Sequence, residues 1–192
     1  MTRFIAFLRA INVGGHNVKM EELRALFESL GLSNVETFIA SGNVVFEAPE
    51  NADNLRQKIE AHLHKSLGYA VTAFIRTDSE IAEIARYKPF DEAKLQAAQA
   101  LNVAFLAGPL SDEAQRTLLR LSTDIDEFHV HGREMYWLCQ RKQSESTFSN
   151  ALFERTLKVK STFRGWNTVQ KLAEKYPPRQ DSGRSESAEK PT

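Results

Sequence analysis

The segment from Arg3 to Ala10 constrains the fold most, because it is apolar at alternate positions on both faces of an extended chain. A short run of this kind, followed by turn residues, is typical of a strand that is covered on both sides. We therefore expect this segment to be a central strand of a sheet.

The patterns that follow predict the element order β-α-β-β-α-β. Apolar residues recur at helical spacing from Met20 to Leu30 and from Leu55 to Leu67, and a glycine follows each run. Residues 35–40 and 44–46 predict two strands joined by a tight turn, and residues 70–76 predict a fourth strand. This order is that of a ferredoxin-like unit, in which two helices pack on one face of a four-stranded antiparallel sheet. Right-handed crossovers place the first and third strands in the centre.

The second half repeats much of this order. A strand pattern at residues 100–107 precedes a helix capped near Ser111, a hairpin spans residues 126–140, and a helix covers residues 150–157. A short connecting helix at residues 81–85 and a last helix at 166–176 complete it. The sequence predicts an α+β protein of two ferredoxin-like (βαββαβ-type) units with antiparallel sheets and an extra C-terminal helix. The predicted boundaries are 1–78 and 79–176, with a disordered tail at 177–192.

Composition narrows the class of function. Lys plus Arg equals Asp plus Glu at 25 each, which argues against nucleic-acid binding through broad phosphate neutralisation. Cys139 is the single cysteine, so no internal disulfide can form. The amino terminus lacks a signal-peptide pattern, and no apolar run is long enough to cross a bilayer. We therefore expect a cytoplasmic protein with no membrane partner.

Several motifs carry a family resemblance. AFLRAINVGG runs from Ala6 to Gly15, SGNVVF runs from Ser41 to Phe46, and RGWNTV runs from Arg164 to Val169. Together with FIRT at residues 74–77 and Pro89-Phe90, they resemble the signature of a widespread bacterial family, domain of unknown function 1697 (DUF1697). The resemblance covers the chain to about Tyr176 and implies two ferredoxin-like units. It implies no activity.

Two positions depart from the pattern of that family. Ala10 stands where the family commonly has Gly, so the first turn of the loop would be less permissive here. Gly165 stands where the family commonly has Asn, which would remove a side-chain amide from any site there.

The strongest candidate site combines two loops at strand ends. The first and second strands should run parallel, so the loop from Arg9 to Asn17 and the turn at residues 41–43 should lie at the same end of the sheet. Glycine pairs let backbone N–H groups converge on an anion, and an arginine would balance its charge. Alternatively, the glycines only supply positive φ in turns. The predicted ligand-binding residues are Arg9, Asn12, Gly14, Gly15, Ser41, Gly42, Asn43, Arg164 and Trp166.

The last two of these residues belong to a second candidate, a basic stretch from Arg155 to Arg164 beside Trp166. A guanidinium and an indole could hold a planar base or a phosphate ester. A solvated helix end with Trp166 as a core anchor would explain the same residues.

We expect no metal site or cofactor, because His129 and His131 have no third ligand nearby and no nucleotide or metal motif is present. Among the loop residues only His16 titrates near neutral pH, so the sequence assigns no catalytic role and leaves enzyme activity open.

The favoured hypothesis is binding of a small anionic ligand, a nucleotide or phosphate ester, at the Arg9–Asn17 loop. One alternative is a protein-interaction or homodimerising scaffold without a catalytic site, since a ferredoxin-like sheet leaves one face open. A second alternative is a single-stranded RNA or other nucleic-acid module, which shares the element order but uses exposed sheet aromatics that are sparse here.

Overall fold

The structure is a computed structural model that describes residues 1–12, 14–39 and 42–179. Ser41, one of the predicted ligand-binding residues, and most of the predicted tail lie outside these ranges. None of the helices in the described ranges is both long and apolar enough to cross a membrane.

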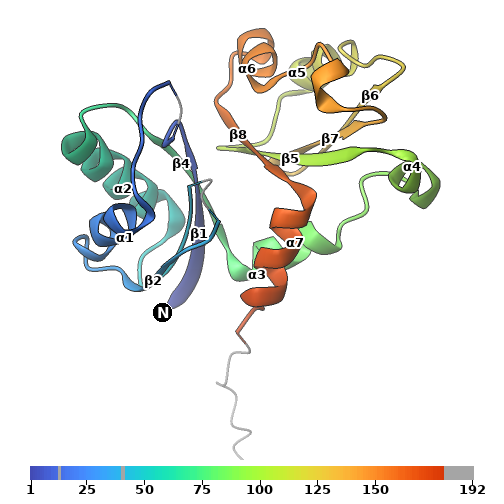
Figure 1. Cartoon of the computed structure of the whole chain (residues 1–192). Helices are drawn as coiled ribbons and strands as arrows, with labels where there is room; N and C mark the ends of the chain where they lie inside the picture. Colours follow the sequence, from blue (N-terminus) through green and yellow to red (C-terminus); the bar gives the residue numbers. More distant parts are fainter. Residues whose placement is uncertain (13, 40–41, 180–192) are drawn as a thin grey trace, which may run out of the picture.

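The first unit is a four-stranded antiparallel sheet of order β2-β3-β1-β4 with α1 and α2 on one face (Figure 1). As predicted, the first and third strands are central. Its elements are β1 (Thr2–Arg9), α1 (Met20–Glu28), β2 (Ser33–Thr37), β3 (Asn43–Ala48), α2 (Ala52–Leu67) and β4 (Thr72–Thr77).

Local sequence explains where these elements begin and end. The Asn51 side chain accepts a hydrogen bond from the Asn54 backbone N–H at 2.9 Å and caps α2, which ends at Gly68 with φ of 80°. β2 begins and ends earlier than the predicted strand at residues 35–40. A shift of register between Ser33 and Glu36, with φ of 49° at Asn34, moves its pairing toward the amino terminus.

The second unit repeats the arrangement with a sheet of order β6-β7-β5-β8. Its elements are β5 (Ala100–Leu106), α5 (Asp112–Leu119), β6 (Asp126–His131), β7 (Glu134–Cys139), the 3-10 turn η1 (Gln143–Glu145), α6 (Asn150–Leu157) and β8 (Ser161–Gly165). Three further helices connect or follow the sheets: α3 (Asp78–Arg86), α4 (Glu92–Ala97) and α7 (Trp166–Lys175).

The sequence patterns missed β8 and α4. β8 completes the βαββαβ order of the second unit, but three of its five residues, Ser161, Thr162 and Arg164, are polar and buried. Such residues carry no apolar alternation, so their pattern did not indicate a strand. α4 has no buried residue, and its N-cap at Asp91 is its clearest signal.

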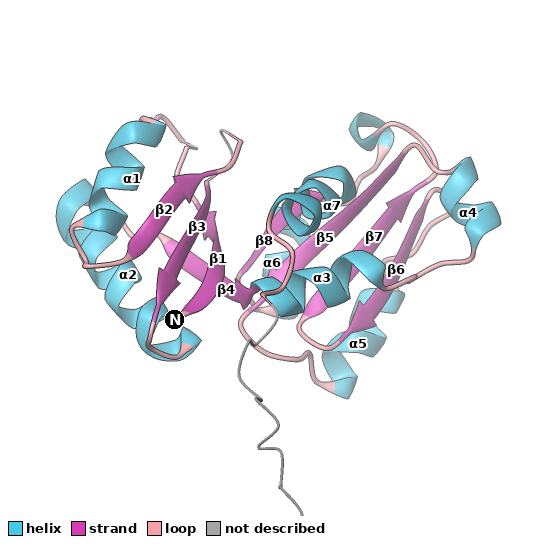
Figure 2. Ribbon diagram, turned by 90° about the horizontal axis from the view of Figure 1, so that it is seen from below, coloured by secondary structure: helices cyan, strands magenta, loops and turns pink. Residues whose placement is uncertain are grey.

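The two sheets share one core. The sheet faces opposite α1 and α2, and opposite α5 and α6, turn toward each other and toward α3 and α7 (Figure 2). At the centre, the rings of Phe7 and Phe105 stack with centroids 3.9 Å apart and an interplanar angle of 10°. β1 is therefore buried on both faces: Phe4 and Leu8 pack under the helices, and Phe7 packs against the second sheet.

The backbone conformation of Ala10, the residue that follows β1, can be tested by substitution. Ala10 has φ of 68°, in the left-handed region, where a Cβ atom costs roughly 1–2 kcal/mol. Ala10→Gly removes that strain at the expense of a larger conformational freedom in the unfolded chain. We expect the free energy of unfolding in urea to rise by about 0.5–1 kcal/mol.

A matched control is Ala25→Gly, at an exposed position within α1. There glycine weakens the helix, and the free energy of unfolding should fall by roughly 0.5–1 kcal/mol. Equal losses in the two variants would contradict a strained Ala10.

Candidate functional site

The two predicted loops meet at one end of the first sheet. The backbone N–H of Leu8 donates to the Gly42 carbonyl at 2.9 Å, which ties the end of β1 to the turn before β3. This proximity agrees with the expectation drawn from parallel β1 and β2.

Contacts within the Arg9–Asn17 loop hold its shape. Asn12 Oδ1 accepts a hydrogen bond from the Val18 N–H at 2.8 Å. His16 stacks on Tyr69 with centroids 3.7 Å apart, and the Tyr69 hydroxyl donates to the Ile11 carbonyl at 3.1 Å. The asparagine therefore closes the loop, and the imidazole packs along an aromatic ring.

The two loops require glycine for different structural reasons. Gly14 and Gly15 have φ of 63° and 88°, and a Cβ added at either would meet no described atom within 4 Å. Positive φ alone calls for glycine there. Gly42 also has positive φ, but a Cβ there would lie 2.5 Å from Ile11 Cγ2. Close packing between the loops thus requires glycine at position 42.

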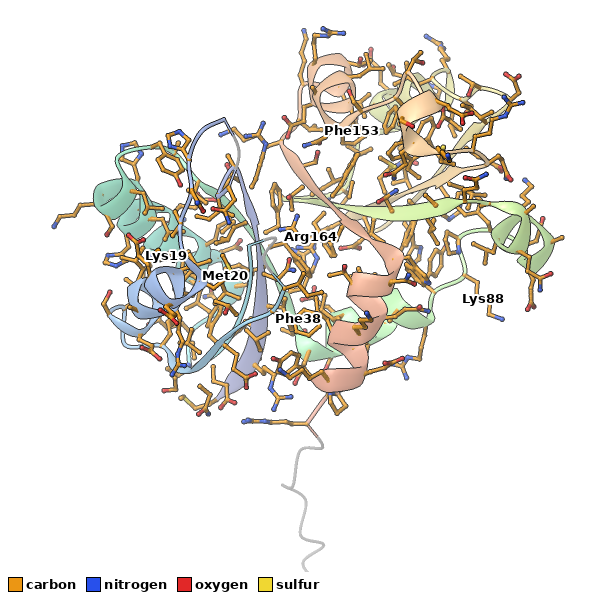
Figure 3. The ribbon with its side chains drawn as sticks, in the orientation of Figure 1. Lys19, Met20, Phe38, Lys88, Phe153 and Arg164 are labelled. Atoms are coloured by element: carbon orange, nitrogen blue, oxygen red, sulfur yellow. The ribbon has the colours of Figure 1, made fainter. Side chains whose placement is uncertain are left out.

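Arg164 and Asn43 form a buried joint between the units. Arg164 lies between the two halves of the molecule (Figure 3) and donates from Nε to Asn43 Oδ1 at 2.6 Å and from Nη2 to the Leu8 carbonyl at 3.1 Å. Its Nη1 donates to Thr162 Oγ1 and the Phe163 carbonyl, both at 2.8 Å. Burial lowers the pKa of Arg164 to about 10.

Asn43 is fully buried and has a second contact, since its Nδ2 donates to the Phe38 carbonyl at 2.9 Å. The structure therefore brings Gly42, Asn43 and Arg164 together, and the hydrogen bonds described above are made within the protein. Any ligand role for them stays a prediction.

A second buried arginine, Arg76, repeats this arrangement and carried no functional signal in the sequence. Its Nε donates to Glu134 Oε1 at 2.7 Å, and its Nη2 donates to the Leu106 carbonyl at 2.9 Å. Burial lowers the pKa of Arg76, with Glu134 opposing that effect. Each sheet thus contributes one buried arginine that donates a hydrogen bond to a backbone carbonyl of the other sheet.

Arg9 is paired across the units. Its Nε and Nη2 donate to the two carboxylate oxygens of Glu154 at 2.7 and 2.5 Å. Burial opposes ionisation of Glu154, but the hydrogen bonds from Arg9 and from the Ser161 N–H outweigh it and hold the pKa of Glu154 below its usual value. The sequence predicted that the charge of Arg9 would balance an anionic ligand. In the structure the Glu154 carboxylate balances that charge.

Trp166 and Arg164 each contact an aromatic ring of the shared core, and the Arg164 guanidinium lies 5.7 Å from the centroid of the Phe7 ring. The indole begins α7 and meets Tyr136 edge-on, with centroids 6.2 Å apart. Gly165 is the N-cap of α7 and provides no side-chain cap, so the departure from the Asn of the resembled family falls at a helix start.

His129 and His131 contact Tyr87 instead of a shared ligand. His129 Nε2 lies 2.7 Å from the Tyr87 hydroxyl, and His131 stacks on the Tyr87 ring. Within residues 1–12, 14–39 and 42–179, no group of three or more His, Cys, Asp or Glu residues could hold a metal ion.

A cavity of about 470 Å³ lies between the units, beside Arg9. Thr72 lines it and pairs with Arg9 in the β1–β4 register, while Leu157 and Lys160 line the side that follows Glu154 in the chain. We call it the inter-unit cavity. Its main apolar and cationic lining residues are Phe74, Leu106, Leu110, Leu157, Arg56 and Lys160.

The two cations of this cavity differ in their partners. Arg56 lies 3.8 Å from Glu60, one helical turn away on α2. No carboxylate of the described chain lies within 4.0 Å of the Lys160 ammonium. Lys160 was part of the predicted basic stretch, whereas Arg56, on a solvated helix face, gave no signal in the sequence.

The Arg164 joint predicts a strong energetic coupling. Asn43→Ala removes the acceptor of the Arg164 Nε–H, and Arg164→Met removes the guanidinium itself, so each variant should lose about 1–3 kcal/mol in the free energy of unfolding. The two losses should not add, and a double-mutant cycle should give a coupling of about 1–3 kcal/mol.

Arg155→Met is the control, because Arg155 is exposed on α6, and the loss there should stay within about 0.5 kcal/mol. Strictly additive losses at positions 43 and 164 would contradict the joint.

Comparison with known proteins places the chain in a family. The model of a protein family described as "Protein of unknown function (DUF1697)" matches residues 1–136. No curated protein matches the chain. One solved structure that it resembles is the conserved bacterial protein SP0830 from Streptococcus pneumoniae, with a TM-score of 0.71 and 23% identity over 93% of this chain and 99% of that one. That likeness shows the fold, and the family match shows that the chain belongs to DUF1697.

Proposed function

We propose that the protein binds a small anionic ligand in the inter-unit cavity. The observation that carries this proposal is a cavity of about 470 Å³ between the units, whose lining combines apolar residues with two cationic side chains, Arg56 and Lys160, and one carboxylate, Glu60, which accepts from the Ala73 N–H. Small-molecule sites commonly have volumes of about 300–1,000 Å³, apolar walls and a few polar groups, and they favour the boundary between two units.

The cavity combines apolar lining residues with cationic side chains. Phe74, Leu106 and Leu110 give the cavity an apolar wall, and the lower dielectric beside such a wall strengthens the attraction between an anion and the cations. The Lys160 charge acts on the Glu154 carboxylate, but no described carboxylate lies within 4.0 Å of its ammonium, so an incoming anion would not have to break a close ion pair. A phosphate ester with an apolar or planar remainder suits both features.

The proposal moves the site from the glycine pair to the neighbouring sheet edge. Gly14 and Gly15 are exposed, and a Cβ added at either position would meet no described side chain within 4 Å that could form a wall. The inter-unit cavity begins at Thr72, the strand partner of Arg9, so the predicted loop and the proposed site are neighbours. The nucleotide or phosphate-ester class of ligand is kept from the sequence-based hypothesis.

The sheet face that the two alternative functions require is covered in this structure. Both depended on an open, apolar sheet face, for a second copy or for unstacked bases. In this chain Ile5, Phe7 and Val45 of the first sheet pack into the core shared with Val103 and Phe105 of the second. A homodimer or a nucleic-acid complex would need another surface.

Thermal shift measurements test the site with inorganic phosphate, nucleoside monophosphates and sugar phosphates as probes. A ligand that binds only the native state raises the melting temperature by mass action. We expect at least one phosphate ester to raise it, and Lys160→Gln to weaken the binding of that ester by about threefold to tenfold because one charge-assisted contact is lost.

Lys158→Gln makes the same charge change two residues away, at an exposed side chain that does not line the cavity. Binding by this control should stay within twofold of the wild type. Equal weakening in both variants, or no melting shift with any phosphate ester, would refute the proposed function.

A further inference from the structure

A second cavity lies on the α3 side of the second sheet, near the same end of that sheet as the inter-unit cavity, since the Leu106 N–H at the end of β5 donates to the Arg133 carbonyl at 3.0 Å. It has a volume of about 610 Å³ and lies between the carboxyl end of α3 and the turn of the β6–β7 hairpin. We call it the hairpin cavity. It shares no lining residue with the inter-unit cavity.

Tyr136 lines the hairpin cavity, and its hydroxyl is buried without a partner among the described residues. The residue lies on β7 and has no exposed surface. A buried polar group in this state is energetically unfavourable, and a ligand acceptor would relieve it. Burial, with smaller effects of Glu134 and Tyr87, raises the pKa of Tyr136, so the group remains a protonated donor at neutral pH.

An aromatic wall stands beside this hydroxyl. Tyr87 follows α3, and its ring stacks on His131 with centroids 4.0 Å apart and an interplanar angle of 13°. The Tyr87 hydroxyl is held by His129 Nε2 at 2.7 Å. Burial, with a contribution from His131, lowers the pKa of His129, which favours a neutral imidazole there. The wall is therefore fixed in place and suited to a flat, uncharged ring.

The charges around the cavity leave one cation available. Arg76 is paired with Glu134, and Arg133 is paired with Glu80. Arg86 donates from Nε to the Ala82 carbonyl at 3.1 Å, but no carboxylate in the described ranges lies within 4.0 Å of its guanidinium. Its Nη groups can therefore bind a carboxylate, which matches the guanidinium fork.

Glu83 narrows the class of ligand further. Its exposed carboxylate lines the same cavity and has no ion-pair partner within 4.0 Å in the described chain. A doubly charged phosphate would be repelled by it more strongly than a singly charged carboxylate. The charges thus favour a monoanion.

We propose that the hairpin cavity is a second ligand site, which binds a small aromatic monocarboxylate carrying a hydrogen-bond acceptor on its ring. Arg86 binds the carboxylate, the Tyr87–His131 pair flanks the ring, and the Tyr136 hydroxyl donates to the ring substituent. The site stands independently of the inter-unit cavity, because it uses none of the same residues.

A matched set of ligands and variants tests each part. The probes are 3- and 4-hydroxybenzoate, benzoate and cyclohexanecarboxylate, titrated into the full-length protein and followed by backbone amide shifts in NMR. At least one hydroxybenzoate should bind more tightly than benzoate, and benzoate more tightly than cyclohexanecarboxylate. The amides of Tyr87 and Gly132 should shift, and those of Leu110 and Leu157 in the inter-unit cavity should not.

Tyr136→Phe isolates the buried hydroxyl. It should weaken the tighter hydroxybenzoate by about fivefold to tenfold and leave benzoate within twofold, since only the former has an acceptor for the lost donor. The melting temperature without ligand should be unchanged or higher, because an unpaired buried hydroxyl is removed. This readout shows that the variant is folded.

Arg86→Gln should weaken both aromatic carboxylates by about tenfold, whereas Lys88→Gln, at an exposed neighbour that does not line the cavity, should leave both within twofold. No amide shifts at millimolar ligand, shifts centred outside the hairpin cavity, or an equal loss of benzoate and hydroxybenzoate in Tyr136→Phe would each overturn the proposal.

Discussion

The face-to-face burial of two sheets is the constraint on which the rest of this structure depends. A four-stranded sheet with helices on one side leaves an apolar face that must be covered. Here the two faces cover each other with help from α3 and α7, and the stacked rings of Phe7 and Phe105 lie where the sheets meet. The closure also buries Arg76 and Arg164, so each must find its hydrogen-bond acceptors across the junction.

The sequence predicted the parts of the fold that are local. Double-sided apolar character placed β1 in the centre of a sheet, and helical spacing with terminal glycines located α1 and α2. β8 was not predicted because its buried residues are mostly polar, and a polar residue in a sequence normally indicates an exposed position. Only the pairing of two distant segments makes Ser161 and Arg164 interior residues.

Sequence reasoning was also limited at the candidate site, because contacts between distant segments determine which residues are buried there. The turn that holds Gly42 and Asn43 was expected beside the Arg9–Asn17 loop, because the parallel relation of β1 and β2 follows from the element order, but the contact of Arg164 with Asn43 does not follow from it. Their hydrogen-bond partners were not accessible to sequence reasoning, since a buried arginine and a ligand-binding arginine have the same spacing in the chain. The two cavities depend on side chains such as Arg56 and Tyr136, which sit on ordinary helical and strand patterns.

Both cavities lie at seams created by the packing of units and connectors. One opens where β4 meets the β5–α5 loop, and the other opens where α3 crosses the end of the second sheet. The shape of each therefore depends on the shared core, which links the proposed binding functions to the cooperativity of the whole chain.

The most direct test of this account measures the stability of each unit in one variant, Phe105→Ala. Fluorescence of Trp137 and Trp166 reports unfolding of the second unit, and hydrogen exchange at the β1 amides reports opening of the first. If the units share one core, both free energies should fall by the same amount, about 3–5 kcal/mol. A loss confined to the second unit, with β1 protection unchanged, would contradict the central claim.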